Sequence, residues 1–310
     1  MRATFIKALA EIAERDDRVM LLTADLGYTV LEEYAARFPK RFINVGVAEQ
    51  NMLGLATGLA EAGFIPFVYS IATFATLRPY EFIRNGPILH QLPVRIVGVG
   101  GGFEYGTAGP THHAVEDVGI LRLQPGIAVI APADYWQARN ALEATWDYPG
   151  PVYYRLGKDE QKTVPGLEGA FTLGEAQLVR DGDALLIVVM GSVAPEAVAA
   201  AEELSVDGIE CGVLVVASVS PAPTKDLIEH LSRFRAVLTA EAHFVTGGVG
   251  SLVSEIVADN GLGCRVLRCG VKAPLGGPGG NEAYLLKQHG ISRDMLREAA
   301  RAVAVQTAAL

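Results

Sequence analysis

Glu49 is the residue whose position in the sequence most strongly suggests chemistry. Residues 42–45, FINV, predict a short buried strand, and after Val47 apolar residues recur at three- and four-residue steps, which predicts a helix. Glu49 would then lie in the first helical turn, on the same face as Met52 and Leu53. A carboxyl group on an apolar helix face can hold a proton or a hydrogen bond in a dry pocket. The simpler alternative is an acid that complements the helix dipole.

Two further groups of residues are candidates for a site. His112 and His113 follow the apolar run 94–99 and a glycine-rich stretch, which predicts a loop beside a sheet. Histidine is the side chain best suited to move protons near neutral pH, although such a pair is often plain solvated surface. Phe74 and Tyr80 could supply a flat surface for a ring, although ordinary core packing explains them equally well from the sequence alone.

The elements that must position these residues alternate between strands and helices. Apolar runs at 19–23, 65–70, 94–99, 128–131 and 152–155 predict strands, and helical patterns lie between them. Strands this apolar favour a parallel sheet that is covered on both faces, with functional groups at the strand carboxyl ends. The helix that would carry Tyr80 is expected from Leu77 to about Ile88. We therefore predict an α/β fold with two open, mainly parallel domains.

The domain boundaries follow from a break in periodicity. Residues 161–178 collect charges, a proline and glycines, which is typical of a linker. We predict a first domain at 1–160 and a second at 179–310. The second domain repeats the alternation, with strands expected at 184–190, 212–216, 236–239 and 265–268 and a short helix from Arg293.

Composition excludes several classes of function. The chain has 310 residues, of which 50% are hydrophobic and 20% charged, and a net charge of -9. This balance is typical of a globular protein and argues against nucleic-acid or membrane-surface partners, because both attract basic patches. The three cysteines and the lack of a signal-peptide pattern favour free thiols in the cytoplasm.

The segment from Arg41 to Gly63 resembles the part of thiamine-diphosphate enzymes of the transketolase and deoxyxylulose-phosphate synthase group that carries their cofactor-activating glutamate. The similarity continues in the same order along the chain with TADL at 23–26, TF at 73–74, GPTHH at 109–113 and PAD at 132–134. It covers only the C-terminal half of a full-length member. The resemblance implies a pyrimidine-binding domain followed by a transketolase C-terminal-like domain.

The resemblance also implies roles for the candidate residues. Glu49 matches the glutamate that hydrogen-bonds the aminopyrimidine of thiamine diphosphate, and Phe74 and Tyr80 match aromatic residues of the same pocket. His112 matches a catalytic histidine that contacts substrate hydroxyls, whereas His113 stands where transketolases more often have glutamine and receives no role.

Substrate contacts are implied in the same way. Arg155 matches an arginine that binds the sugar phosphate, and Thr29 and Arg2 match two further phosphate contacts. For Arg2, an exposed N-terminal charge is an equally good interpretation. The sequence departs from the family at Ala108, where transketolases carry an aspartate, and at Gly100 or a neighbour, where they carry a histidine. These departures favour an unusual or smaller substrate, and they leave open whether specificity has changed or activity has been lost.

The resemblance further implies a partner. The GDG motif with a following asparagine, which holds the cofactor's diphosphate and Mg²⁺ in this group, is not found in the sequence. We therefore expect no metal ligands from this chain, and a separate N-terminal-section chain that supplies that half of the site in an α2β2 heterotetramer.

The predicted function is ketol transfer. The chain would be half of an enzyme that moves a two-carbon unit from a ketose to an aldehyde through a thiamine-diphosphate enamine. The sequence does not identify the donor, the acceptor, the pathway or the partner. Two alternatives remain: the β subunit of a 2-oxo acid dehydrogenase, which lacks THH followed by ED, and a non-catalytic homologue, which would not need Glu49.

Overall fold

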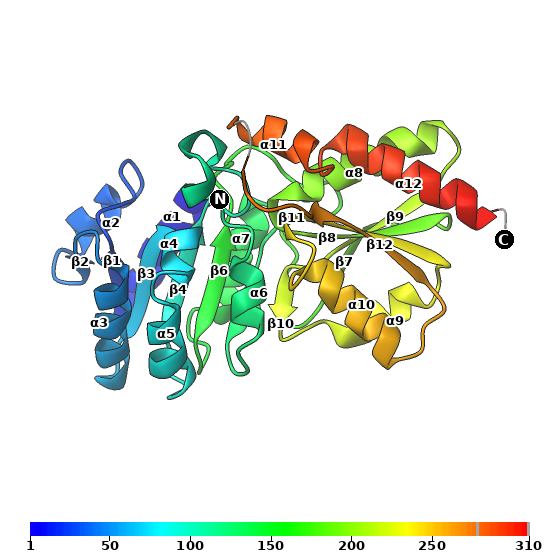
Figure 1. The fold of residues 1–310 in the computed structure, drawn as a ribbon. Helices are drawn as coiled ribbons and strands as arrows, with labels where there is room; N and C mark the ends of the chain where they lie inside the picture. The colour runs from blue at the N-terminus through cyan, green and yellow to red at the C-terminus, as the bar shows by residue number, and fades with distance from the viewer. Residues whose placement is uncertain (277–278, 309–310) are drawn as a thin grey trace.

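The computed structural model describes residues 1–276 and 279–308 and contains two sheets with helices on both faces of each (Figure 1). The first sheet has the strand order β10-β5-β6-β4-β3-β1-β2, and the second has the order β12-β11-β8-β9-β7. Every pairing in both sheets is parallel except those of β10 with β5 and β7 with β9. This arrangement confirms the predicted fold class.

The first sheet is built from the apolar runs of the sequence. Its strands are β1 (Val19–Thr23), β2 (Phe42–Asn44), β3 (Ile65–Ile71), β4 (Arg95–Val99), β5 (Ala128–Ile130) and β6 (Val152–Leu156), and β10 (Ser218–Ser220) completes it. All residues of β1, β3, β4, β5 and β6 are buried. Continuous burial of this kind is expected of strands covered on both faces.

The helices of the first half are α1 (Arg2–Arg15), α2 (Glu32–Arg37), α3 (Glu49–Glu61), α4 (Ala72–Thr76), α5 (Tyr80–Ile83), α6 (Asp117–Arg122) and α7 (Tyr135–Thr145). Helices α1 and α7 pack on one face, where Phe5 lies edge-on against Tyr154 of β6 at 5.1 Å between ring centroids. Helix α3 packs on the other face through Met52 and Leu53. The sheet therefore separates two apolar layers.

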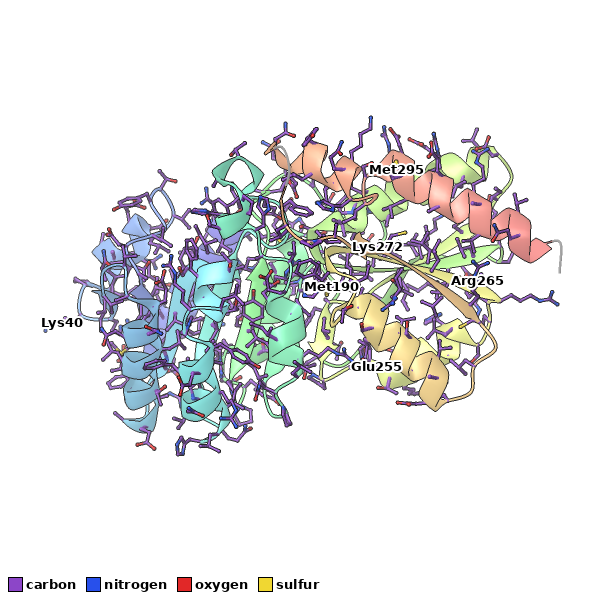
Figure 2. All side chains as sticks on the ribbon, in the orientation of Figure 1. Lys40, Met190, Glu255, Arg265, Lys272 and Met295 are labelled. Atoms are coloured by element: carbon purple, nitrogen blue, oxygen red, sulfur yellow. The ribbon has the colours of Figure 1, made fainter. Side chains whose placement is uncertain are left out.

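The second sheet is built in the same way. Its strands are β7 (Gln177–Arg180), β8 (Leu185–Met190), β9 (Cys211–Val215), β11 (Ala236–Phe244) and β12 (Arg265–Val271), and its helices are α8 (Ala194–Val206), α9 (Thr224–Leu231), α10 (Val249–Asp259), α11 (Glu282–Gln288) and α12 (Arg293–Ala308). Helices α8 and α12 cover one face and α9 and α10 the other (Figure 1). Figure 2 shows Met190 near the middle of the molecule, where the two halves meet, whereas Lys40 and Arg265 point outward at opposite ends.

The predicted helix from Leu77 to about Ile88 is wrong in detail. The structure has α4, a turn at residues 77–79, the four-residue α5 and a π-helical turn at Arg84–Ile88. Pro79 explains the break, because proline lacks the backbone N–H that continues a helix and restricts the residue before it. Arg78 consequently lies in a turn between two short helices.

The two halves share a sheet. Strand β10 follows β9 of the second sheet in the chain but pairs antiparallel with β5 of the first, with Ser218 opposite Ile130. Strands β7 and β10 were not predicted from the sequence, and the helix from Arg293 is longer than expected, at 16 residues. Val164 and Leu167, within the predicted linker, are buried in the same core as the strands of the second half.

No helix within the described residues is long and apolar enough to span a membrane.

Candidate functional site

Glu49 begins helix α3, on the face predicted from the sequence. The buried residues of the helix are Glu49, Met52, Leu53, Ala56 and Ala60. Strand β2 leads into the helix through Gly46, whose φ of 74° is in the left-handed region that favours glycine. The Glu49 side chain is 3% exposed. The structure therefore places a buried carboxyl group at the positive end of a helix that packs on the first sheet.

The Glu49 carboxylate has a cationic partner that was not predicted from the sequence. Arg78 Nη1 donates hydrogen bonds to both carboxylate oxygens, at 3.0 Å to Oε1 and 2.9 Å to Oε2. The hydroxyl of Ser70, near the end of β3, lies 3.5 Å from Oε1. The carboxylate is thus held from two sides, by a guanidinium and by a hydroxyl.

A cavity opens beside this ion pair. It has a volume of about 320 Å³ and is lined by Val47, Ala48, Glu49, Gln50 and Arg78. The carboxylate and the guanidinium both belong to its wall. A small planar group that carries hydrogen-bonding nitrogens could therefore reach Glu49 from this side.

Phe74 of α4 lies next to the same ion pair. The Arg78 guanidinium carbon is 3.9 Å from the centroid of the Phe74 ring, which is a close cation–π contact. The Phe74 side chain is half-buried, so its ring belongs neither to the closed core nor to the open surface. A buried carboxylate beside such a ring suits a planar, nitrogen-containing heterocycle, because the heterocycle can stack while its nitrogen bonds the carboxyl group.

His112 also contacts Phe74. The two rings are 5.0 Å apart between centroids and meet edge to face, at 66°. His112 ends a short 3₁₀ turn at Pro110–His112, is half-buried, and has its Nδ1 3.0 Å from the Thr111 hydroxyl. Glu49, Phe74 and His112 are therefore linked through a chain of contacts near the carboxyl ends of the central strands, where a parallel sheet is expected to gather functional groups.

His113 makes a different set of contacts. It is buried, lies edge-on to Phe103 at 5.2 Å between centroids, and has its Nε2 3.3 Å from the carbonyl oxygen of Gly106. Phe103 also stacks on His289, which follows α11, at 4.9 Å. The His113 side chain thus helps to pack the loop against the second half.

The contacts of Tyr80 tie α5 to α6. Its hydroxyl donates to the carbonyl oxygen of Ile120 at 2.9 Å and accepts from Gln124 at 2.6 Å. A contact of Tyr80 with a bound ring stays a prediction.

Arg155 occupies an interior position rather than an open one. Its side chain is 3% exposed, and Nε forms an ion pair with Asp117 Oδ2 at 2.9 Å. Nη2 donates to the carbonyl oxygens of Ala114 at 2.8 Å and Ala242 at 2.9 Å. Because Ala242 belongs to β11, this guanidinium joins the two halves of the chain. The geometry therefore gives Arg155 a structural role, and its predicted phosphate contact stays a prediction.

Lys158, three residues after Arg155, lies near the Tyr105 ring and was not predicted from the sequence as a site residue. Its Nζ donates to the carbonyl oxygen of Glu104 at 3.1 Å and lies 4.2 Å from the centroid of the Tyr105 ring. Tyr105 in turn lies 6.4 Å from His112 between ring centroids. The available signal was a basic residue just beyond the end of a predicted strand, where functional groups gather in a parallel sheet.

Arg2, like Lys158, lies near the Tyr105 ring. Burial raises the pKa of both Tyr69 and Tyr105, and in each case the charge of Arg2 opposes part of the rise, which places its guanidinium near both rings. Thr29 is exposed in a loop, with a φ of 68° and its backbone N–H donating to Glu32 Oε1 at 2.7 Å. A left-handed threonine is uncommon, and such strain is concentrated in functional loops.

The charge of Glu104, next to Tyr105 and Lys158, should change near neutral pH. Burial, followed by the charge of Glu282, raises the pKa of Glu104 to about 7. Burial also raises the pKa of Glu282, which belongs to α11 of the second half. The two carboxyl groups therefore interact across the junction between the histidine loop and that half.

No cluster of three or more His, Cys, Asp or Glu side chains that could hold a metal ion occurs within residues 1–276 and 279–308.

Comparison with known proteins places the chain in a family. Residues 1–162 match the family model described as transketolase, pyrimidine binding domain, and residues 174–295 match transketolase, C-terminal domain. The 6-deoxy-6-sulfo-D-fructose transketolase subunit of a Clostridium species is 36% identical over 98% of this chain and 94% of its own. A subunit of the apulose-4-phosphate transketolase of Actinobacillus succinogenes is 31% identical over 90% of both chains.

A solved structure is similar over nearly the whole chain. It is described as a split gene transketolase, inactive beta4 tetramer, and matches with a TM-score of 0.87 and 32% identity over 98% of this chain and 97% of its own. These similarities favour a transketolase over the 2-oxo acid dehydrogenase alternative. The chain belongs to the transketolase family and corresponds to its pyrimidine-binding and C-terminal domains.

Proposed function

We propose that this chain is the C-terminal-half subunit of a split, thiamine-diphosphate-dependent transketolase and is active only with an N-terminal-section partner. The observation that carries the proposal is the buried Glu49 carboxylate and the half-buried Phe74 ring, which contact the same Arg78 side chain. Glu49 would hydrogen-bond the aminopyrimidine, and Phe74 would stack on it. When bound, the cofactor supplies a thiazolium carbon that becomes a nucleophile once it loses a proton.

His112 would act on the substrate. Its edge-to-face contact with Phe74 supports this role, because the imidazole would then lie beside the bound cofactor and close to the substrate hydroxyls. An imidazole there can donate or accept a hydrogen bond near neutral pH. We assign it the positioning of those hydroxyls and the transfer of a proton to or from one of them.

The substrate would carry an anionic group at its far end. Arg2 and Lys158 bring two positive charges to the corner next to Tyr105, and Thr29 lies in the strained loop predicted to contact a phosphate. The names of the two relatives mention a sulfonated sugar and a sugar phosphate, which fits an anion at this end. Ala108 removes an aspartate from the loop that would read the sugar hydroxyls, so the preferred sugar would differ from that of ordinary transketolases.

The partner chain would hold the cofactor's diphosphate and Mg²⁺. The two relatives are subunits by name, and the similar solved structure is called inactive as a tetramer of β chains, which supports an enzyme completed by a second chain. We propose an α2β2 heterotetramer with each cofactor between unlike subunits. The three cysteines are free and buried, which fits the reducing cytoplasm.

Calorimetry tests this proposal. Thiamine diphosphate with Mg²⁺ is titrated into this chain alone, into the N-terminal-section chain alone and into the mixture, and ketol transfer is then assayed with phosphorylated and sulfonated ketoses. We expect tight binding and activity in the mixture. Tight binding and full activity of this chain alone would contradict the split site, and release of CO₂ from a 2-oxo acid would contradict the reaction.

A further inference from the structure

The Arg78 side chain contacts the two groups that would receive the aminopyrimidine. It extends from the turn at residues 77–79, which Pro79 forces between α4 and α5. One of its nitrogens bonds both oxygens of Glu49, and its guanidinium lies over the ring of Phe74. A single side chain thus makes the contact with the carboxyl group and the contact with the aromatic face.

The ion pair with Arg78 compensates for the burial of the Glu49 carboxylate. A carboxylate that is 3% exposed loses most of its hydration, and this loss is unfavourable unless a donor replaces the water. The Ser70 hydroxyl, at 3.5 Å, is at the limit of a hydrogen bond, so Arg78 supplies the main compensation. The guanidinium therefore stabilises the buried Glu49 carboxylate in the folded chain.

Arg78 can leave its contact with Glu49 at little cost to its own hydration. Its side chain is 44% exposed, so the guanidinium regains water as soon as it turns outward. The side chain starts from a turn, so its departure breaks no helix or strand. Only the carboxylate of this pair is buried, so the loss of the Arg78 contact is offset once another donor satisfies Glu49.

A guanidinium and an aminopyrimidine have the same recognition chemistry. Each is planar and conjugated, each stacks on an aromatic face, and each presents a polarised nitrogen to a carboxyl group. Because Arg78 already bonds both Glu49 oxygens and lies over the Phe74 ring, the two groups compete for the same carboxyl group and the same aromatic face. We infer that Arg78 is a displaceable cap that occupies the aminopyrimidine position in the cofactor-free subunit and must leave it before the cofactor can bind. This inference rests on the proposed function of Glu49 and Phe74.

The cap predicts effects of opposite sign on stability and on binding. In Arg78→Met a long side chain remains but the Glu49 carboxylate loses its charged partner, so the free chain should melt a few degrees lower. The cofactor no longer competes with a guanidinium, so its Kd in the complex with the N-terminal section should fall roughly five- to tenfold. A merely structural arginine would lower stability without tightening binding.

The experiment combines thermal melting of this chain alone with calorimetric titration of thiamine diphosphate and Mg²⁺ into the complex. Arg84→Met is the matched control, because it removes the same charge from an exposed arginine of the neighbouring turn, whose Nη1 bonds Asn85. This control should leave both the melting temperature and the Kd unchanged. Arg78→Lys provides a second test that keeps the charge, and it should bind the cofactor more tightly than wild type while retaining more stability than Arg78→Met.

The outcomes separate the cap from the proposed function. If the wild-type complex binds the cofactor and both Arg78 variants bind it equally or more weakly, Arg78 is a bystander or a cofactor ligand and the cap is wrong. If neither the wild-type complex nor the variants bind it, the proposed function fails and the cap fails with it. Tighter binding by either Arg78 variant, with Arg84→Met at the wild-type value, supports the cap.

Discussion

At the scale of single residues, Glu49 provides the most direct test of the site. In Glu49→Gln the side chain keeps its size but can no longer share a proton with a heterocyclic nitrogen, so kcat of the complete enzyme should fall at least about a hundredfold. Steady-state assays of the complex would measure this loss. Glu61→Gln, at the exposed far end of the same helix, is the control and should leave kcat unchanged. Wild-type kcat in Glu49→Gln would favour a non-catalytic homologue.

Some features of these residues could be predicted from the sequence, and others could not. Glu49 was predictable because its burial follows from helical spacing, which is local information. The partner of its carboxylate was not, because Arg78 is 29 positions away in the chain and a long side chain can point in several directions from a turn. Arg155 was assigned by resemblance alone, and nothing in the strand PVYYR indicates that Asp117 and Ala242 enclose it.

At the scale of the elements, the ion pair of Arg155 and Asp117 joins β6 to α6 and should matter for stability. In Arg155→Met the Asp117 carboxylate stays buried without its charged partner, so the free energy of unfolding should fall by about 3–5 kcal/mol. Urea denaturation would measure the change as a shift in the midpoint.

A second ion pair with the same separation provides the control. Arg233 and Asp181 also lie 2.9 Å apart, but their side chains are 46% and 70% exposed. Arg233→Met should change the free energy of unfolding by no more than about 0.5 kcal/mol. Equal losses in the two variants would mean that burial does not decide the strength of these pairs.

The contact between the histidine loop and α11 should depend on pH. The pKa of Glu104 is raised from its usual value of 4.5 to about 7 in the folded chain, first by burial and then by the charge of Glu282. Between these values the folded state holds a proton that the unfolded state has released, so this contribution to stability is greatest below pH 4.5 and is lost as the pH rises through 7.

Melting temperatures measured from about pH 5 to about pH 8 test this dependence. Glu104 should lower the wild-type melting temperature by roughly 2–4 °C over this range, and Glu104→Gln should remove that part of the decrease. Glu298→Gln, on the exposed side of α12, should leave the wild-type slope unchanged. An identical slope in Glu104→Gln would show that other groups cause the dependence.

The elements were predictable to the extent that their signals are local. Long apolar runs predicted β3, β4, β6 and β8 with small errors at the ends. Strand β10 has only three residues, and its pairing with β5 depends on the arrangement of both halves, which no local pattern contains. The later start of α5 does have a local signal, since the helix was predicted from Leu77 although Pro79 lies just before Tyr80, where α5 begins.

At the scale of the whole molecule, the two halves should unfold together. The first sheet includes β10 from the second half, and the Arg155 guanidinium bonds backbone oxygens on both sides of the junction. Scanning calorimetry of this chain should therefore show one transition, with equal calorimetric and van't Hoff enthalpies. Two separable transitions would show that the junction is too weak to couple the halves.

The crossing of β10 also bears on how such a chain can be rearranged in evolution. A recombination event within residues 161–178 would give the first half a foreign second half and would remove the edge strand of its own sheet. Only a donor that carries an equivalent strand at the same point could repair that edge, since an unpaired edge invites aggregation. The two halves should therefore be inherited as a single module, and engineered chimaeras should exchange them together.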